Sequence, residues 1–281
     1  MTKAEDNPSE QAQSETFIPS SLRGALRVEL QRVRKPPYSV LVCISVNAIL
    51  VALLWFVAPT WLHDLFFSWD STYFFPIVLA SWMIADVPAT NQLAPDRSRV
   101  LPSLDNTEAI ARLLRSKHLA IALICTPITV TAAIIVGFVT GAWVTMVLTV
   151  VWVSTVPLSS IGIACIVGVL WPYHELPLKT RWQMRSQWRT IILRWGVLIL
   201  LPYGLVPALG LVGMAPSLLI WWVAKAFGQS GKALDAAFLA GLLIATPLAL
   251  FIWRRASNYA ARLAVRRSTF LTEYLSDPLL G

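Results

Sequence analysis

Apolar runs long enough to cross a lipid bilayer recur along this chain, and they constrain its fold more than any other feature. A transmembrane helix needs roughly 20 consecutive apolar residues. The runs are Tyr38–Pro59, Trp69–Ala85, Leu119–Thr140, Trp143–Trp171, Thr190–Gly213 and Ala233–Trp253. Hydrophobic residues make up 56% of the chain and charged residues 14%, against about 45–50% and about 25% in soluble domains. We therefore predict an all-α integral membrane protein with about six transmembrane helices.

Basic residues predict the orientation of these helices. Of the 23 Lys and Arg residues, all but Lys225 and Lys232 lie within residues 3–35, 97–117, 179–194 and 254–267. With six spans, these four segments share one side of the membrane, and short cytoplasmic segments are the ones that carry excess positive charge. The sequence thus predicts a multi-pass plasma-membrane protein with both termini cytoplasmic. Because the positive charge follows topology, nucleic-acid binding is disfavoured.

Changes in composition divide the chain into four regions. Residues 1–17 are polar and predict a disordered cytoplasmic tail. Residues 18–36 are amphipathic, residues 37–253 hold the six-span domain, and residues 254–281 form a basic cytoplasmic tail. We predict that 18–36 forms an elbow helix on the inner leaflet, with anionic lipid headgroups as its partners; a plain topology anchor is the simpler alternative. The predicted headgroup contacts are Arg23, Arg27, Arg32, Arg34 and Lys35.

The segment before the third run resembles a capping box. Asp105 is the predicted N-cap and Glu108 the N3 residue of a helix that leads into Leu119–Thr140. A capped helix on the cytoplasmic side suits docking of a soluble partner, while a solvated connector is the alternative. The candidate docking residues are Asp105, Glu108, Arg112 and Arg115.

Two further features concern the last third of the chain. Leu218–Val223 is too short to cross the bilayer, so we predict an interfacial or re-entrant element, with an extra pass as the alternative. Pro202 and Pro207 interrupt the fifth run and mark a candidate gate or helix break, for which ordinary kinking is the alternative.

Motifs for chemistry are sparse. Gly228-Gln229-Ser230-Gly231-Lys232 is similar to the end of a phosphate-binding loop, but Ala226 replaces its upstream Gly and Ala233 its Ser or Thr. His63, His118 and His174 lack zinc-site spacing. We predict no catalytic residue, no metal and no cofactor in this chain. Few ionisable residues lie within the spans, which disfavours an ion-driven transporter and favours lipid-like or amphipathic cargo.

The order of the segments resembles the membrane subunit of type-2 (ABC-2-like) ABC exporters. Similarity to compact bacterial permeases of that group lies in Asp86–Asn91, in Ala109–Leu119 and in the end of the fourth run, Ile166–Tyr173. The resemblance implies export across a bacterial plasma membrane, ATP and Mg²⁺ bound by a separate ATPase subunit, and docking of that subunit near Asp105–Ser116 and on the elbow. It also implies a homodimer or a pair with a related second permease.

Two other functions fit the same sequence. A non-transporting scaffold or accessory subunit of an envelope-associated complex accounts equally well for the Trp-rich surfaces. A membrane-embedded lipid enzyme would need a cluster of acidic residues or histidines at one interface, for which Asp86, Asp96, Asp105 and Glu108 are the nearest candidates.

Overall fold

A computed structural model describes residues 17–35, 38–57, 92–172 and 215–277, together with residues 77, 78, 80, 81, 174, 212 and 213. Most of the predicted second and fifth spans, including Pro202 and Pro207, lies outside these residues, as do most of the polar tail and Asp86–Asn91. Within the described part the chain is helical and contains no strand. The prediction of an all-α protein is confirmed there.

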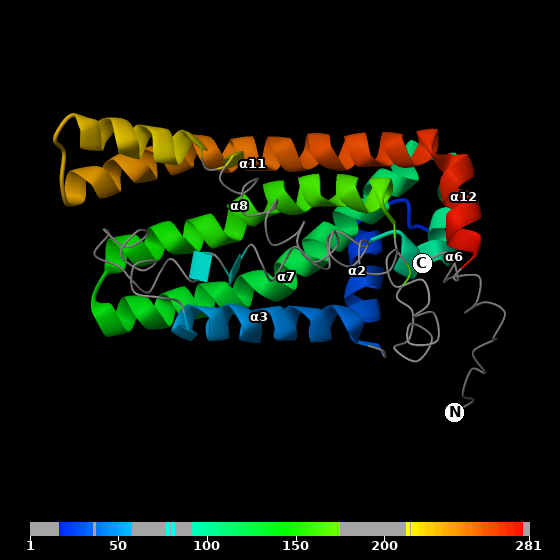
Figure 1. Ribbon diagram of the computed structural model, residues 1–281, viewed down its shortest axis with the longest axis horizontal. Helices are drawn as coiled ribbons and strands as arrows, with labels where there is room; N and C mark the ends of the chain where they lie inside the picture. Colours follow the sequence, from blue (N-terminus) through cyan, green and yellow to red (C-terminus); the bar gives the residue numbers. More distant parts are fainter. Residues whose placement is uncertain are drawn as a thin grey trace, which may run out of the picture.

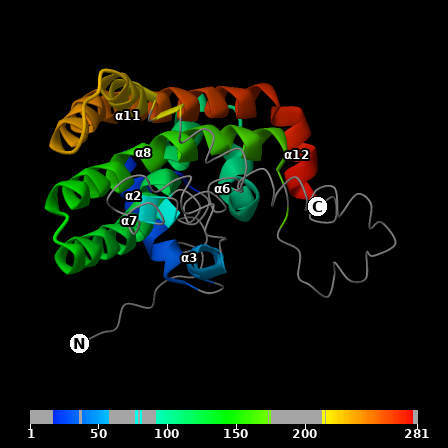
Figure 2. The ribbon, with the colours of Figure 1, turned by 60° about the vertical axis from the view of Figure 1, so that its left-hand side comes forward.

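Long helices run along the molecule and short ones cross it at one end (Figure 1). The long helices are α3 (Ser39–Val57), α7 (Thr107–Thr140), α8 (Trp143–Leu170) and α11 (Lys232–Arg266). In Figure 1, α2 (Leu22–Val33) and α12 (Ser268–Ser276) lie across one end of this bundle, and Figure 2 shows α12 turning away from the end of α11. Three short elements complete this end: η1 (Ala94–Asp96), α6 (Arg97–Val100) and η2 (Leu101–Ser103). We call it the basic end, and the opposite end the far end.

Three helices, α7, α8 and α11, are long and apolar enough to cross a membrane. These helices support the coarser prediction, a membrane protein, while the number of spans stays a prediction. The 34 residues of α7 and the 35 residues of α11 make each helix about 50 Å long at 1.5 Å per residue. A hydrocarbon core is about 30 Å thick. Because the apolar run of α7 begins at Leu119 and that of α11 ends at Trp253, we expect the excess of about 20 Å to protrude from the membrane at the basic end.

The start of α7 differs from the prediction by one residue. The side chain of Asn106, not Asp105, is the N-cap, because its amide oxygen accepts hydrogen bonds from the backbone N–H groups of Glu108 at 3.1 Å and Ala109 at 3.0 Å. Asp105 as N-cap is therefore wrong, and Glu108 occupies the second helical position. The helix then continues without interruption to Gly141, whose φ of 70° ends it in the left-handed conformation.

At the far end, residues 215–226 form a helix that turns back into α11. It lies beside the first part of α11 (Figure 1). Gly241 allows this contact, because a Cβ atom there would lie 3.0 Å from the backbone nitrogen of Ser217, closer than carbon and nitrogen normally approach. The predicted interfacial or re-entrant element is thus a short helix packed on α11, and its place relative to a membrane stays a prediction.

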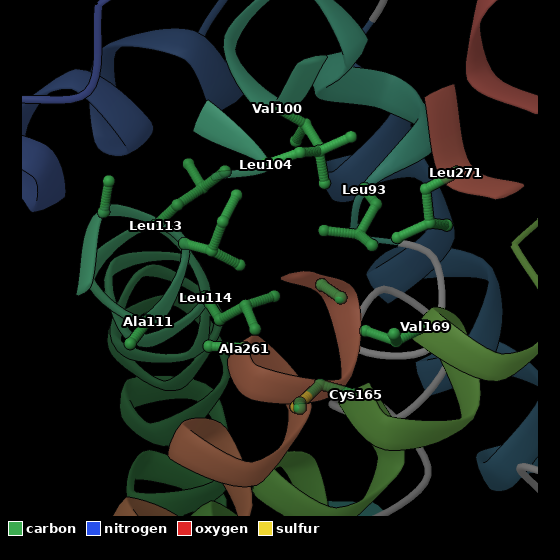
Figure 3. Close-up of a cluster of buried hydrophobic side chains, with 14 of the residues drawn as sticks. Leu93, Val100, Leu104, Ala111, Leu113, Leu114, Cys165, Val169, Ala261 and Leu271 are labelled. Atoms are coloured by element: carbon green, nitrogen blue, oxygen red, sulfur yellow. The ribbon is translucent and has the colours of Figure 1, made fainter. Parts of the chain in front are cut away.

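A hydrophobic core closes the basic end. It joins Leu93, Val100 and Leu104 with residues of α7, α8, α11 and α12, and its members are fully or nearly buried (Figure 3). Val169 and Cys165 come from α8, and Leu271 from α12. A second cluster lies toward the far end, where the rings of Trp152 on α8 and Phe238 on α11 stack at 5.3 Å. The protruding part of the bundle therefore has a core of its own.

Candidate functional site at the basic end

Five charged side chains from four elements meet at the basic end. They are Glu29 and Arg32 from α2, Asp96 from η1, Arg99 from α6 and Lys117 from α7. The Arg99 guanidinium lies 2.7 Å from a Glu29 oxygen and 2.8 Å from an Asp96 oxygen, and the Lys117 amine lies 3.6 Å from Glu29. Arg32 and Lys117 each pair with Asp96 as well. We call these residues the ion cluster.

Burial makes the ion cluster energetically important. The side chains of Glu29, Asp96 and Arg99 are at most 5% exposed, while that of Arg32 is 37% exposed. Three cations surround two carboxylates, so each carboxylate is matched by more than one positive charge. A buried ion pair contributes little compared with a well-packed apolar contact, but removing one partner leaves an unpaired buried charge and is costly. The cluster therefore fixes α2 in one position on α7.

The environment shifts the pKa of Glu29 downward. Burial alone raises the pKa of this carboxyl, but the charges of Lys117, Arg99 and Arg32, together with a hydrogen bond from Arg99, lower it by more. Glu29 is therefore ionised at neutral pH, and its charge is required for the ion cluster to hold together.

A second set of contacts joins α7 and α11 through polar groups, and α8 and α11 through a close backbone approach, near the basic end of the apolar runs. The indole N–H of Trp253 donates to Nδ1 of His118 at 3.0 Å, and the Ser257 hydroxyl lies 3.3 Å from the same nitrogen. This acceptor role places the proton of a neutral His118 ring on Nε2. On the other side of Trp253, a Cβ at Gly162 of α8 would lie only 2.9 Å from the Trp253 Cα. The three helices are thus held by both a hydrogen bond and a close backbone approach.

Contacts of α12 fix the end of α8. The Arg267 guanidinium, at the corner between α11 and α12, donates to the backbone carbonyls of Val169 at 2.9 Å and Leu170 at 2.7 Å. These are carbonyls that the last turn of a helix leaves without an intrahelical partner. His174 stacks on Tyr274 of α12 at 5.0 Å and also makes a 2.9 Å hydrogen bond to its carbonyl oxygen. The corner between α11 and α12 therefore holds the end of α8 and the residue His174 in place.

The predicted docking residues do not share one surface. Asp105 and Glu108 are exposed at the start of α7. Arg112 is half-buried and pairs with Glu108 at 3.2 Å, one turn earlier. Arg115 points toward α11, where it hydrogen-bonds Asn258. Of these four residues, Asp105 and Glu108 at the start of α7 are thus the ones whose side chains are exposed to a partner.

The predicted headgroup residues of α2 divide in a similar way. Four of them are exposed, namely Arg23, Arg27, Arg34 and Lys35. Arg32 instead turns toward η1, where it also donates to the Pro95 carbonyl at 2.6 Å. Arg32 thus pairs with Asp96 while its side chain stays 37% exposed, and its contact with lipid headgroups stays a prediction.

The sequence reasoning missed the ion cluster itself. The amphipathic pattern of residues 18–36 predicts a helix on the inner leaflet and says nothing of a buried charge, whereas the buried residues of α2 are Ala25 and Glu29. A signal was present: Glu29 is the only carboxylate in a helix with three arginines. Asp96 likewise stands beside Arg97 and Arg99, between prolines at positions 95 and 102. Helical periodicity counts apolar residues and gives no weight to a buried charge.

The described residues contain no group of three His, Cys, Asp or Glu side chains placed to hold a metal ion. What the basic end provides is a positively charged, well-packed surface that is continuous with helices long and apolar enough to span a membrane. No family model, no curated protein and no solved structure matches the chain.

Proposed function

We propose that this chain is the membrane subunit of an exporter similar to the type-2 ABC exporters. It would move lipid-like or amphipathic cargo across a bacterial plasma membrane, with the basic end in the cytoplasm. The chain would span the membrane six times and form a homodimer or pair with a related second permease. ATP and Mg²⁺ would be bound by a separate ATPase subunit docked at the basic end.

One observation carries the proposal. The exposed first turn of α7 lies at one end of an unbroken helix of 34 residues that enters the membrane-spanning bundle. The ion cluster fastens α2 to the same helix. Because packed helices transmit displacement as rigid bodies, a partner that pushed on Asp105 and Glu108 would move α7 and α2 together. A continuous element of this kind is needed to couple ATP hydrolysis by a soluble subunit to transport through the membrane.

Charge reversal at the first turn of α7 tests the proposal. The doubly substituted Asp105→Arg, Glu108→Arg chain should still insert and fold, because both side chains are exposed, but it should lose the co-purifying ATPase in mild detergent. Glu273→Arg on the exposed face of α12 is the matched control and should retain it. Mass spectrometry of the purified complexes provides the measurement. If the wild-type chain co-purifies with no ATPase, the exporter proposal fails.

A non-transporting scaffold is the second candidate, and the rigidity of the basic end favours it. The ion cluster and the Arg267 contacts hold α2, α8 and α12 in one arrangement, which suits a fixed platform for other proteins. ATP hydrolysis separates the two functions. An exporter should couple hydrolysis to the first turn of α7, whereas a scaffold should bind partners without any such dependence.

A further inference from the structure

We propose that the exposed face of the last part of α11 binds an acidic segment of a soluble protein. This face carries aromatic and arginine side chains at helical spacing, and all of them are exposed. We call it the arginine stripe, and its members are Phe251, Arg254, Arg255, Tyr259, Arg262 and Arg266. The inference is independent of the proposed function, because it holds for any soluble partner, whether or not that partner hydrolyses ATP.

The arginine stripe is not used to hold the fold together. The opposite face of the same helix is made of small buried side chains, among them Ala256, Ala260 and Ala264, which pack against the rest of the bundle. Arg255 lies over the Phe251 ring at 5.1 Å. Within the residues that the structure describes, none of the four arginines forms an ion pair with a carboxylate. Four positive charges are therefore presented on one side of a helix without neutralisation.

The length of the stripe distinguishes a soluble partner from a lipid surface. The apolar part of α11 ends at Trp253, so Arg254 and Arg255 lie near the boundary of the hydrocarbon core. Arg262 and Arg266 lie about 12 and 18 Å further along the helix axis at 1.5 Å per residue. The headgroup layer adds only about 5–8 Å on each side of the core. Lipid phosphates can thus reach the first two arginines, while the last two lie beyond them.

The chemistry of the stripe selects carboxylates. Arginine forms bidentate pairs with carboxylates, and its guanidinium is weakly hydrated, so it is the preferred cation for protein interfaces. Tyr259 follows Arg255 by one turn and is exposed, so it offers the aromatic contact typical of interface centres. A partner segment with several Asp or Glu residues, lying along α11, would match this pattern.

Binding of an acidic peptide tests the proposal. The full-length chain is reconstituted in nanodiscs of zwitterionic lipid, and a fluorescein-labelled decaglutamate peptide is titrated at low ionic strength while anisotropy is followed. The Arg262→Glu, Arg266→Glu chain should bind the peptide at least about tenfold more weakly than wild type, the effect of losing about 1.4 kcal/mol. The Arg23→Glu, Arg27→Glu chain removes the same charge from the exposed face of α2 and should bind within about twofold of wild type. Equal weakening by both pairs, or no weakening by the α11 pair, would overturn the proposal.

A depth measurement tests the lipid alternative. Nitroxides are attached at Arg255→Cys, Arg262→Cys and Arg266→Cys, each in a chain whose three native cysteines are replaced by alanine, in vesicles that contain phosphatidylglycerol. We expect the labels at positions 262 and 266 to relax mainly with a water-soluble nickel reagent, and the label at position 255 to relax more with oxygen. If positions 262 and 266 instead respond mainly to oxygen, the stripe lies on lipid and the proposal is wrong. Circular dichroism of each variant verifies that the helices remain folded.

Discussion

Glu29 brings a negative charge into a helix that is otherwise basic, and it lies where Arg99 and Lys117 can both reach it. Its substitution should show how strongly α2 is held. Glu29→Gln keeps the shape of the side chain but leaves three cations facing one carboxylate, and we expect a loss of about 3 kcal/mol. Thermal unfolding in mild detergent measures this loss. Glu108→Gln is the control, because the Glu108 side chain is 84% exposed and its pair with Arg112 should contribute below about 1 kcal/mol.

Acid should weaken the same contact. The pKa of Glu29 is held below its ordinary value of 4.5, so its ionisation stabilises the folded state fully above about pH 4.5, and this stability is lost as the pH falls through the lower folded value. We expect the midpoint of thermal unfolding of the wild-type chain to fall steeply below about pH 4.5. The Glu29→Gln chain should show a shallower fall over that range. Parallel acid profiles for the two chains would contradict this assignment.

Among the elements, α8 and α11 approach each other most closely at Gly162. A side chain there would meet the backbone of Trp253, which cannot move aside as a flexible side chain could. Gly162→Val should therefore separate the two helices and cost about 1–3 kcal/mol. Loss of the Trp253 to His118 hydrogen bond should appear as a red shift in tryptophan emission. Val147→Leu, at a half-exposed position of α8, enlarges the same helix without this contact and should be nearly neutral.

The sequence predicts these elements better than it predicts their contacts. Apolar length alone locates both ends of α3 and α8, the end of α7 and the start of α11 to within about two residues, because a helix that crosses a membrane must be about 20 apolar residues long. It does not predict that α7 begins 12 residues before its apolar run or that α11 ends 13 residues after its own. The N-cap of α7 was missed by one residue, because Asp105 and Asn106 are both good N-caps and only the fold selects between them. The ion cluster joins Glu29 to residues roughly 70 to 90 positions later in the chain, and no local pattern reports such a distance.

At the scale of the whole molecule, α11 connects the far end to the basic end, so its two ends should lie on opposite sides of the membrane. Gln229, in the turn before α11, and Glu273, on α12, are both exposed. Each is replaced by cysteine, as Gln229→Cys and Glu273→Cys, in separate chains. We expect a membrane-impermeant maleimide to label position 229 in intact cells and position 273 only after the cells are opened. Labelling of both positions from outside would contradict a single crossing by α11 and the proposed orientation.

The core at the basic end also sets an order of assembly during synthesis. It contains Ile18 near the beginning of the described chain and Leu275 near its end. A ribosome adds about 5–20 residues per second, so roughly 10–50 seconds separate these two residues. During that interval the membrane-spanning helices are already made, while the carbonyls of α8 still lack Arg267. A nascent chain stalled before α12 would thus present an open apolar surface at the membrane, which quality-control proteases could recognise.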